Sequence, residues 1–135
     1  MSVNWKLMIQ LRERQKMEAS DLVAKERQVV AESEVQVQSA QGRLNQELAA
    51  KTALWQQTRS SFDGGAVNVE QLRFATSYSK VLDARAAEAA KAVHDAQSEM
   101  QKKLVVLDER RQQLREAMGD LEKAKEMQVR HLKQL

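Results

Sequence analysis

The sequence predicts an all-α fold, a long two-helix antiparallel coiled-coil hairpin formed by residues 1–135 as one domain. The chain contains no proline, and the strong helix formers Ala, Glu, Lys, Arg, Gln and Leu dominate it. Apolar and small residues recur every seven positions in both halves, which is the coiled-coil signal. The only paired glycines lie near the midpoint, where a hairpin would turn.

The first helix is predicted over about residues 3–62. Nothing in this segment interrupts a helix apart from one isolated glycine. The residues that we expect on its buried seam are spaced by seven and are Ile9, Lys16, Val23, Val30, Val37 and Leu44.

A tip loop is predicted over about residues 63–67, within the stretch SSFDGGAVN. Gly64 suits the left-handed residue that ends many helices, because it has no Cβ to clash. Asn68 is a good N-cap, and Gln71 follows three residues later as in a capping box. A turn this short requires the two helices to run antiparallel.

The second helix is predicted over about residues 68–134. Its seam series is Leu72, Ser79, Ala86, Val93, Met100, Leu107, Leu114, Leu121, Gln128 and Leu135. The companions three residues on are Ala75, Leu82, Ala89, Ala96, Lys103, Arg110, Ala117, Ala124 and His131.

Folding back at Gly65 gives facing residues whose numbers sum to about 130, so that Val23 meets Leu107 and Val37 meets Val93. Many seam residues are alanine, which buries little area, so we expect marginal stability and fraying ends. The polar residues on or near the seam are Lys16, Lys51, Ser79, Lys103, Arg110 and Gln128.

The composition excludes several classes of protein. Zero cysteines exclude disulfides and thiolate metal sites. The first residues lack the apolar core and cleavage site of a signal peptide, and no apolar run approaches the roughly 18 residues of a membrane span. We therefore expect a soluble, cytoplasmic protein. The net charge of +3 divides into +2 for residues 1–30, −2 for residues 31–100 and +3 for residues 101–135.

No catalytic or cofactor motif is found. The stretch LVVLDE at residues 104–109 resembles a magnesium-binding strand of ATPases, but no phosphate-binding loop accompanies it and it continues the seven-residue repeat. His94 and His131 have no further ligand at helical spacing, so neither suggests a zinc site. Acidic residues interleave with the basic runs, which argues against nucleic-acid binding. We predict no enzymatic activity, no cofactor, no metal and no membrane insertion.

Four of the five aromatic residues flank the turn within 24 residues. They either plug the tip or form a patch on which a partner docks, and both roles are compatible if Phe62 packs the turn while Trp55 and Tyr78 face outward. The four residues are Trp55, Phe62, Phe74 and Tyr78.

The chain resembles the FliJ/YscO family, the small stalk proteins of flagellar and injectisome type III secretion. The resemblance lies in LRERQKMEASDLVAKE near the start, in the GG tip and in VEQLRFATSYSKVLDARAAEAAKAV after it, where Phe74 and Tyr78 occupy the family's aromatic and apolar positions. The flagellar branch usually has tyrosine-rich positions before the loop, where this chain has Lys51 and Trp55, and a longer basic tail. These differences favour the injectisome branch.

The resemblance implies a stalk whose terminal ends insert into the pore of the homohexameric secretion ATPase and stimulate it at the cytoplasmic face of the inner membrane. It also implies that the aromatic tip docks on the cytoplasmic ring of the export gate, that substrate chaperones are possible partners, and that the free protein is a monomer. The expected pore contacts are Met8, Leu11, Arg12, Lys16, Arg111, Arg115, Lys125 and Arg130.

Another interpretation is a structural coiled-coil tether, or an adaptor that escorts chaperones, without an ATPase partner. Such a protein would more often form parallel dimers or higher assemblies through its surface heptads. Each basic residue by itself is also compatible with an ordinary solvated helix face.

Overall fold

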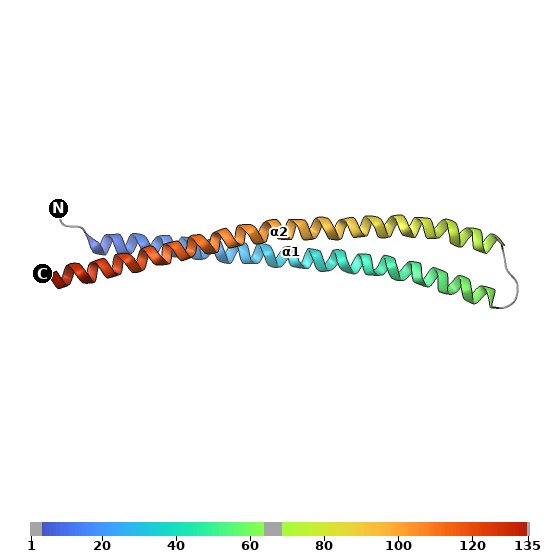
Figure 1. Cartoon of the computed structure of the whole chain (residues 1–135), viewed down its shortest axis with the longest axis horizontal. Coiled ribbons are helices and arrows are strands. Elements are labelled where there is room, and N and C mark those ends of the chain that lie inside the picture. Colours follow the sequence, from blue (N-terminus) through green and yellow to red (C-terminus); the bar gives the residue numbers. More distant parts are fainter. Residues whose placement is uncertain (1–3, 64–68, 135) are drawn as a thin grey trace. The chain divides into compact units, whose positions relative to one another are not determined.

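The computed structural model describes residues 4–63 and 69–134, and the described residues form two helices and no strand. Helix α1 spans Trp5–Phe62 and helix α2 spans Val69–Gln134. The all-α helical hairpin predicted from the sequence is confirmed (Figure 1). The predicted glycine turn and the Asn68 cap lie outside the described residues.

Asn4 explains where α1 begins. Its side-chain Oδ1 accepts a hydrogen bond of 3.2 Å from the Leu7 N–H, and its carbonyl accepts one of 3.1 Å from the Met8 N–H. The asparagine thus satisfies an N–H group that has no partner within the first helical turn. At the other end, the Asp63 N–H still donates to the Arg59 carbonyl at 3.1 Å.

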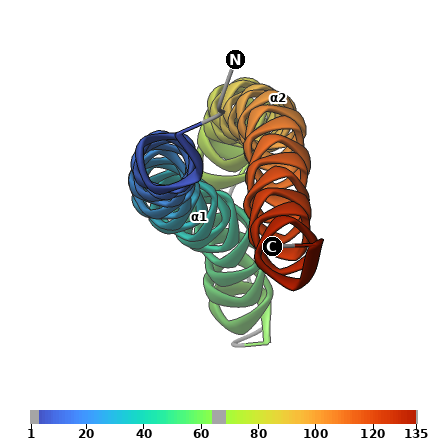
Figure 2. The ribbon, with the colours of Figure 1, turned by 90° about the vertical axis from the view of Figure 1, so that its left-hand side faces the viewer.

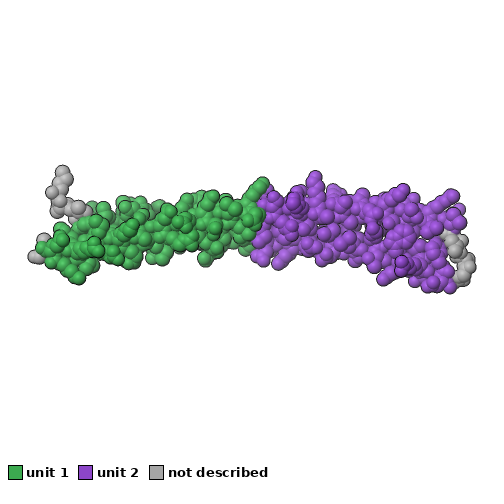
Figure 3. Space-filling view, viewed as in Figure 1, with its two compact units in different colours: residues 1–32, 101–135 green, residues 33–100 purple. Residues whose placement is uncertain are grey.

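The contacts within the chain divide it into two compact units (Figure 3). Unit 1 consists of residues 1–32 and 101–135, and unit 2 consists of residues 33–100. In unit 1 the start of α1, blue in Figures 1 and 2, lies beside the end of α2, orange to red. In unit 2 the end of α1 lies beside the start of α2. Each unit is therefore an antiparallel pair of helical segments.

The seven-residue seam predicted from the sequence is confirmed. In α1, every residue of the predicted series from Ile9 to Leu44 is buried or half-buried. In α2, the same holds for both series from Ala75 to His131. The buried apolar residues of the two units are Val23, Ala75, Leu82, Ala89, Val93, Leu107, Leu121 and Ala124.

Leu72 is the exception, because 39% of it is exposed although it was expected on the seam. It lies in the first turn of α2, level with the last turn of α1, where little of the facing helix remains to cover it. Leu135, the last residue of the predicted series, lies outside the described residues.

The contacts between the helices within each unit are compatible with the expected register. Arg12 contacts Asp120 in unit 1, and Lys51 contacts Asp83 in unit 2, so the residue numbers sum to 132 and 134. Leu54 and Ala75, which line one hollow of unit 2 from opposite helices, sum to 129. These sums lie close to the expected value of about 130.

The seam is more polar than a typical coiled coil. Ser79 is buried, and Lys16, Lys51, Lys103, Arg110 and Gln128 are half-buried, as the sequence predicts. A second α1 series, three residues after the predicted one, was not predicted and is also covered. The buried or half-buried members of this series are Arg12, Ala19, Glu26, Ser33, Ala40, Glu47 and Leu54.

Within residues 4–63 and 69–134, neither helix contains a stretch apolar enough to cross a lipid bilayer.

Candidate protein-binding surfaces

Unit 1 holds all eight residues that were expected to contact an ATPase pore. The two helix ends meet here: the rings of Trp5 in α1 and His131 in α2 have centroids 6.2 Å apart, at an angle of 48°. The beginning of α1 and the end of α2 therefore form one protein surface, although they are far apart in the sequence.

Arg12 and Lys16, two of the expected pore contacts on α1, already make contacts or are half-buried within unit 1. The Arg12 Nη1 lies 3.8 Å from Asp120 Oδ2 and donates a hydrogen bond of 3.0 Å to Gln15 Oε1. Lys16 is half-buried on the seam. The chain itself thus limits what Arg12 and Lys16 can offer to a partner.

Met8 and Arg12 line a hollow of about 190 Å³ between the helices of unit 1. Asp120, Ala124 and Met127 of α2 form its other side. Met8 and Met127 are both exposed, so the hollow has apolar rims around the Arg12–Asp120 ion pair. Leu11 lies on the exposed surface of α1.

The four cations on α2 are exposed: Arg111, Arg115, Lys125 and Arg130. Arg115 Nη2 donates a hydrogen bond of 2.8 Å to Gln112 Oε1 on the same helix. Lys125 and Arg130 border a shallow hollow of about 320 Å³ together with Val129. These α2 cations are more available to a partner than Arg12 and Lys16.

Two side chains of unit 1 bury a polar atom, and the sequence indicated the burial of one of them. Trp5 Nε1 and Arg110 Nε are buried without a hydrogen-bond partner among the described residues. Arg110 keeps one contact, because its Nη1 donates to Gln113 Oε1 at 3.1 Å. The position of Arg110 in the seam series indicated its burial, whereas no sequence pattern indicated that of Trp5.

Unit 2 holds the four aromatic residues that were expected at the tip, and two of them form an exposed pair. The rings of Phe74 and Tyr78 are stacked, with centroids 5.8 Å apart and an angle of 9°. Phe74 is 67% exposed, so it is more accessible than the half-buried Trp55 and Phe62. Trp55, which was expected to face outward, is half-buried, and Phe74 is the more exposed of the two.

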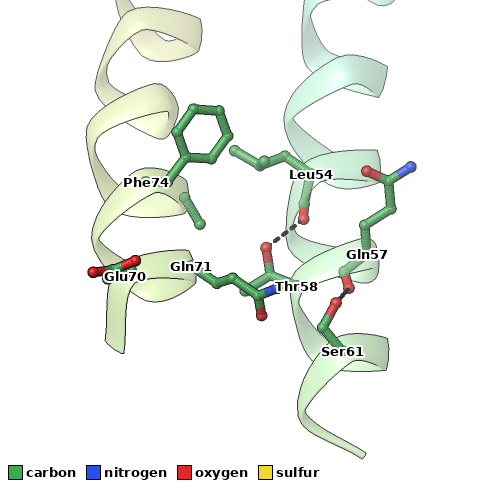
Figure 4. A pocket seen from close by; sticks show the side chains of 8 residues that line it. Leu54, Gln57, Thr58, Ser61, Glu70, Gln71 and Phe74 are labelled. Atoms are coloured by element: carbon green, nitrogen blue, oxygen red, sulfur yellow. Dashed lines mark hydrogen bonds between the residues drawn. The ribbon is translucent and has the colours of Figure 1, made fainter. Parts of the chain in front are cut away.

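A hollow of about 370 Å³ lies beside Phe74, between the two helices of unit 2 (Figure 4). Leu54 and Thr58 line it from α1, and Phe74 and Ala75 line it from α2. Thr58 Oγ1 donates to the Leu54 carbonyl at 2.8 Å, so this hydroxyl is satisfied within its own helix. The hollow therefore offers mainly apolar contacts.

Polar side chains surround this hollow. Figure 4 shows Gln71 extending from α2 toward Thr58 of α1, with Glu70 beside it. Ser61 Oγ donates to the Gln57 carbonyl at 3.0 Å. An apolar centre with a polar rim is the usual composition of a protein-binding site.

The described residues contain no group of three or more His, Cys, Asp or Glu side chains that could hold a metal ion. His131 contacts Trp5, and His94 is exposed. The surfaces described above carry exposed cations, exposed apolar side chains and open hollows.

No protein-family model, curated protein or solved structure matches this chain.

Proposed function

We propose that this chain is a non-enzymatic, protein-binding helical hairpin that serves as the central stalk of a type III secretion system. In this role, unit 1 inserts into the pore of the hexameric export ATPase and stimulates it, and unit 2 docks on the export gate in the cytoplasm. The resemblance of the sequence to FliJ/YscO proteins suggests the system. Unit 1 carries the net positive charge, and unit 2 holds four of the five aromatic residues, which supports a different partner for each unit.

The observation that carries the proposal is the placement of exposed cations on unit 1. Arg111, Lys125 and Arg130 are exposed on α2, and Lys125 and Arg130 lie within six residues of His131, which contacts Trp5 where the helix ends meet. Such cations can pair with acidic side chains that line a pore. Their contribution would fall as salt screens the charges.

A two-helix segment inside a six-fold ring cannot make the same contacts with all six subunits. It would therefore favour different conformations in different subunits, which provides a means of coupling to nucleotide turnover. The exposed Phe74–Tyr78 pair of unit 2 supports a second binding site, because exposed aromatic residues are frequent anchors of protein interfaces.

The test is the nucleotide turnover of the type III secretion ATPase from the same organism, with and without this protein. We expect stimulation at about one chain per six ATPase subunits, and weaker stimulation at high salt. The double variant Arg111→Glu/Arg130→Glu should lose stimulation and remain helical by circular dichroism. No stimulation together with no co-elution would contradict the stalk proposal.

One observation favours a second function, that of a coiled-coil tether or chaperone-escort adaptor. Leu104, Met118 and Leu132 are exposed on α2 at multiples of seven residues. Surface residues at this spacing suit the docking of a further helix. Sedimentation equilibrium separates the two functions, because a stalk should be monomeric and a tether that assembles through its heptads should form larger species.

A further inference from the structure

A line of five exposed residues runs along α2 within unit 1, separate from the buried seam. Apolar and basic side chains alternate along it at intervals of seven residues. We call it the outer line, and it consists of Leu104, Arg111, Met118, Lys125 and Leu132.

Its apolar members are accessible: Leu104 is 36% exposed, Met118 is 44% exposed and Leu132 is 61% exposed. Residues seven apart lie on one face of a coiled-coil helix, so the five side chains share a side of α2. At about 1.5 Å per residue the outer line is about 42 Å long. This length matches a partner helix of about 28 residues.

The two cations of the outer line are free within unit 1. Among residues 4–63 and 69–134, neither Arg111 nor Lys125 forms an ion pair or a side-chain hydrogen bond. This contrasts with Arg12, which is paired with Asp120 on the facing helix. The outer line thus has charges at a regular spacing that no ion pair within the described residues neutralises. Asp108 and Glu122, which precede Arg111 and Lys125 by three residues, are also exposed on this helix.

The charge pattern argues against a second copy of this chain as the occupant. If two outer lines ran parallel in register, Arg111 would face Arg111. If they ran antiparallel about Met118, Arg111 would face Lys125. Both arrangements bring like charges together, which is destabilising. The complementary partner has acidic residues at these two levels.

We propose that the outer line is a docking site for an acidic amphipathic helix of another protein. Apolar side chains of that helix pack on Leu104, Met118 and Leu132, and its carboxylates pair with Arg111 and Lys125. Arg111 and Lys125 are also among the proposed ATPase contacts, but the test below contains no ATPase, so the stalk proposal and this one can fail separately.

The test uses a fluorescein-labelled synthetic helix in which leucine and glutamate alternate at successive heptad positions of one face. Fluorescence anisotropy with the full chain should show saturable binding. The double variant Arg111→Glu/Lys125→Glu should bind it about tenfold more weakly or worse, since two attractive exposed pairs become repulsive. A second probe with lysine in place of glutamate should prefer this variant, which restores the complementarity.

The matched control is Lys80→Glu/Lys91→Glu, which makes the same change in net charge at two exposed positions of α2 in unit 2. It should bind the glutamate probe as the unchanged protein does. Equal weakening by both double variants would mean unspecific charge attraction and overturn the proposal. Absence of binding to the unchanged protein would also overturn it.

The variant Met118→Gln tests the apolar contacts and keeps good helix propensity. It should weaken binding of the glutamate probe without a change in helicity. If sedimentation instead shows a dimer that this variant dissociates, a second copy occupies the outer line and the proposal is wrong.

Discussion

Units 1 and 2 share one seven-residue repeat and fill it with side chains of different size. Four of the nine α2 seam residues of unit 2 are alanine, and Leu82 is its large, fully buried side chain at 1% exposure. The α2 seam of unit 1 has three leucines; the charged Lys103 precedes them, and Arg110 lies between the first two. The leucines of unit 1 are Leu107, Leu114 and Leu121.

The difference shows that one seven-residue repeat can distribute its buried apolar area in two ways. Apolar burial in unit 2 is concentrated in a few residues, because an alanine removes little area from water. In unit 1 it is spread over several leucines and reduced by buried polar atoms such as Arg110 Nε. Unit 2 should therefore be sensitive to a single truncation, and unit 1 should gain from the removal of a polar group.

The largest effect is expected from Leu82→Ala. Truncation of a fully buried leucine costs about 3 kcal/mol, and the neighbouring alanines cannot fill the cavity. Urea unfolding followed by circular dichroism should show this loss. Hydrogen exchange should place the faster exchange in residues 33–100. The half-buried Leu114→Ala of unit 1 is the matched control and should cost about half as much, so an equal or greater loss there would remove the distinction.

Arg110→Leu should stabilise the protein by about 1 kcal/mol. The variant removes a guanidinium whose Nε is buried without a partner among the described residues, and such a group is costly. Thermal unfolding measures the gain. The neighbouring Arg111→Leu is the control, because Arg111 is exposed and its replacement should change stability by about 0.5 kcal/mol or less. A destabilised Arg110→Leu would mean that the arginine stabilises the seam.

Asn4→Ala should cost about 1 kcal/mol through the loss of the cap that begins α1. Because the cap belongs to unit 1, hydrogen exchange should speed up in the first turns of α1 and not in residues 33–100. Asn4→Asp keeps an acceptor at the same place and should retain the stability. Equal effects of alanine and aspartate would show that the cap contributes nothing.

The smallest effect is expected from Asp83→Asn, at about 0.5 kcal/mol or less. The Asp83 Oδ1 lies 2.5 Å from Lys51 Nζ in unit 2, but both side chains are partly exposed to solvent. The difference between the variant and the unchanged protein should vanish in high salt. A large loss that persists in high salt would show that the pair holds the register of unit 2.

The sequence predicted the fold and the seam because helix periodicity is local. The absence of proline and the seven-residue series are sufficient to place residues such as Val23, Leu107 and Leu121 on a buried face. The register was predicted only as a sum of about 130, because two repeats of seven also match when one is shifted by a whole heptad. The contact of Arg12 with Asp120 is compatible with the predicted sum.

The second α1 series was not recognised because polar residues such as Arg12, Glu26 and Glu47 interrupt its small and apolar members. The small and apolar members are Ala19, Ala40 and Leu54. The exposure of Phe74 was predictable, since Phe74 and Tyr78 are four residues apart and both lie outside the seam series. The seven-residue spacing of the outer line is visible in the sequence. Only the structure shows that its two cations form no ion pair in the described part of the chain.

The most direct test of the account is hydrogen exchange of the full chain with and without the hexameric secretion ATPase. The account predicts that the ATPase protects residues 5–32 and 101–134 and leaves the exchange around Phe74 and Tyr78 unchanged. Protection confined to residues 33–100, or no protection in a mixture that co-elutes, would contradict the assignment of unit 1 as the ATPase-binding part.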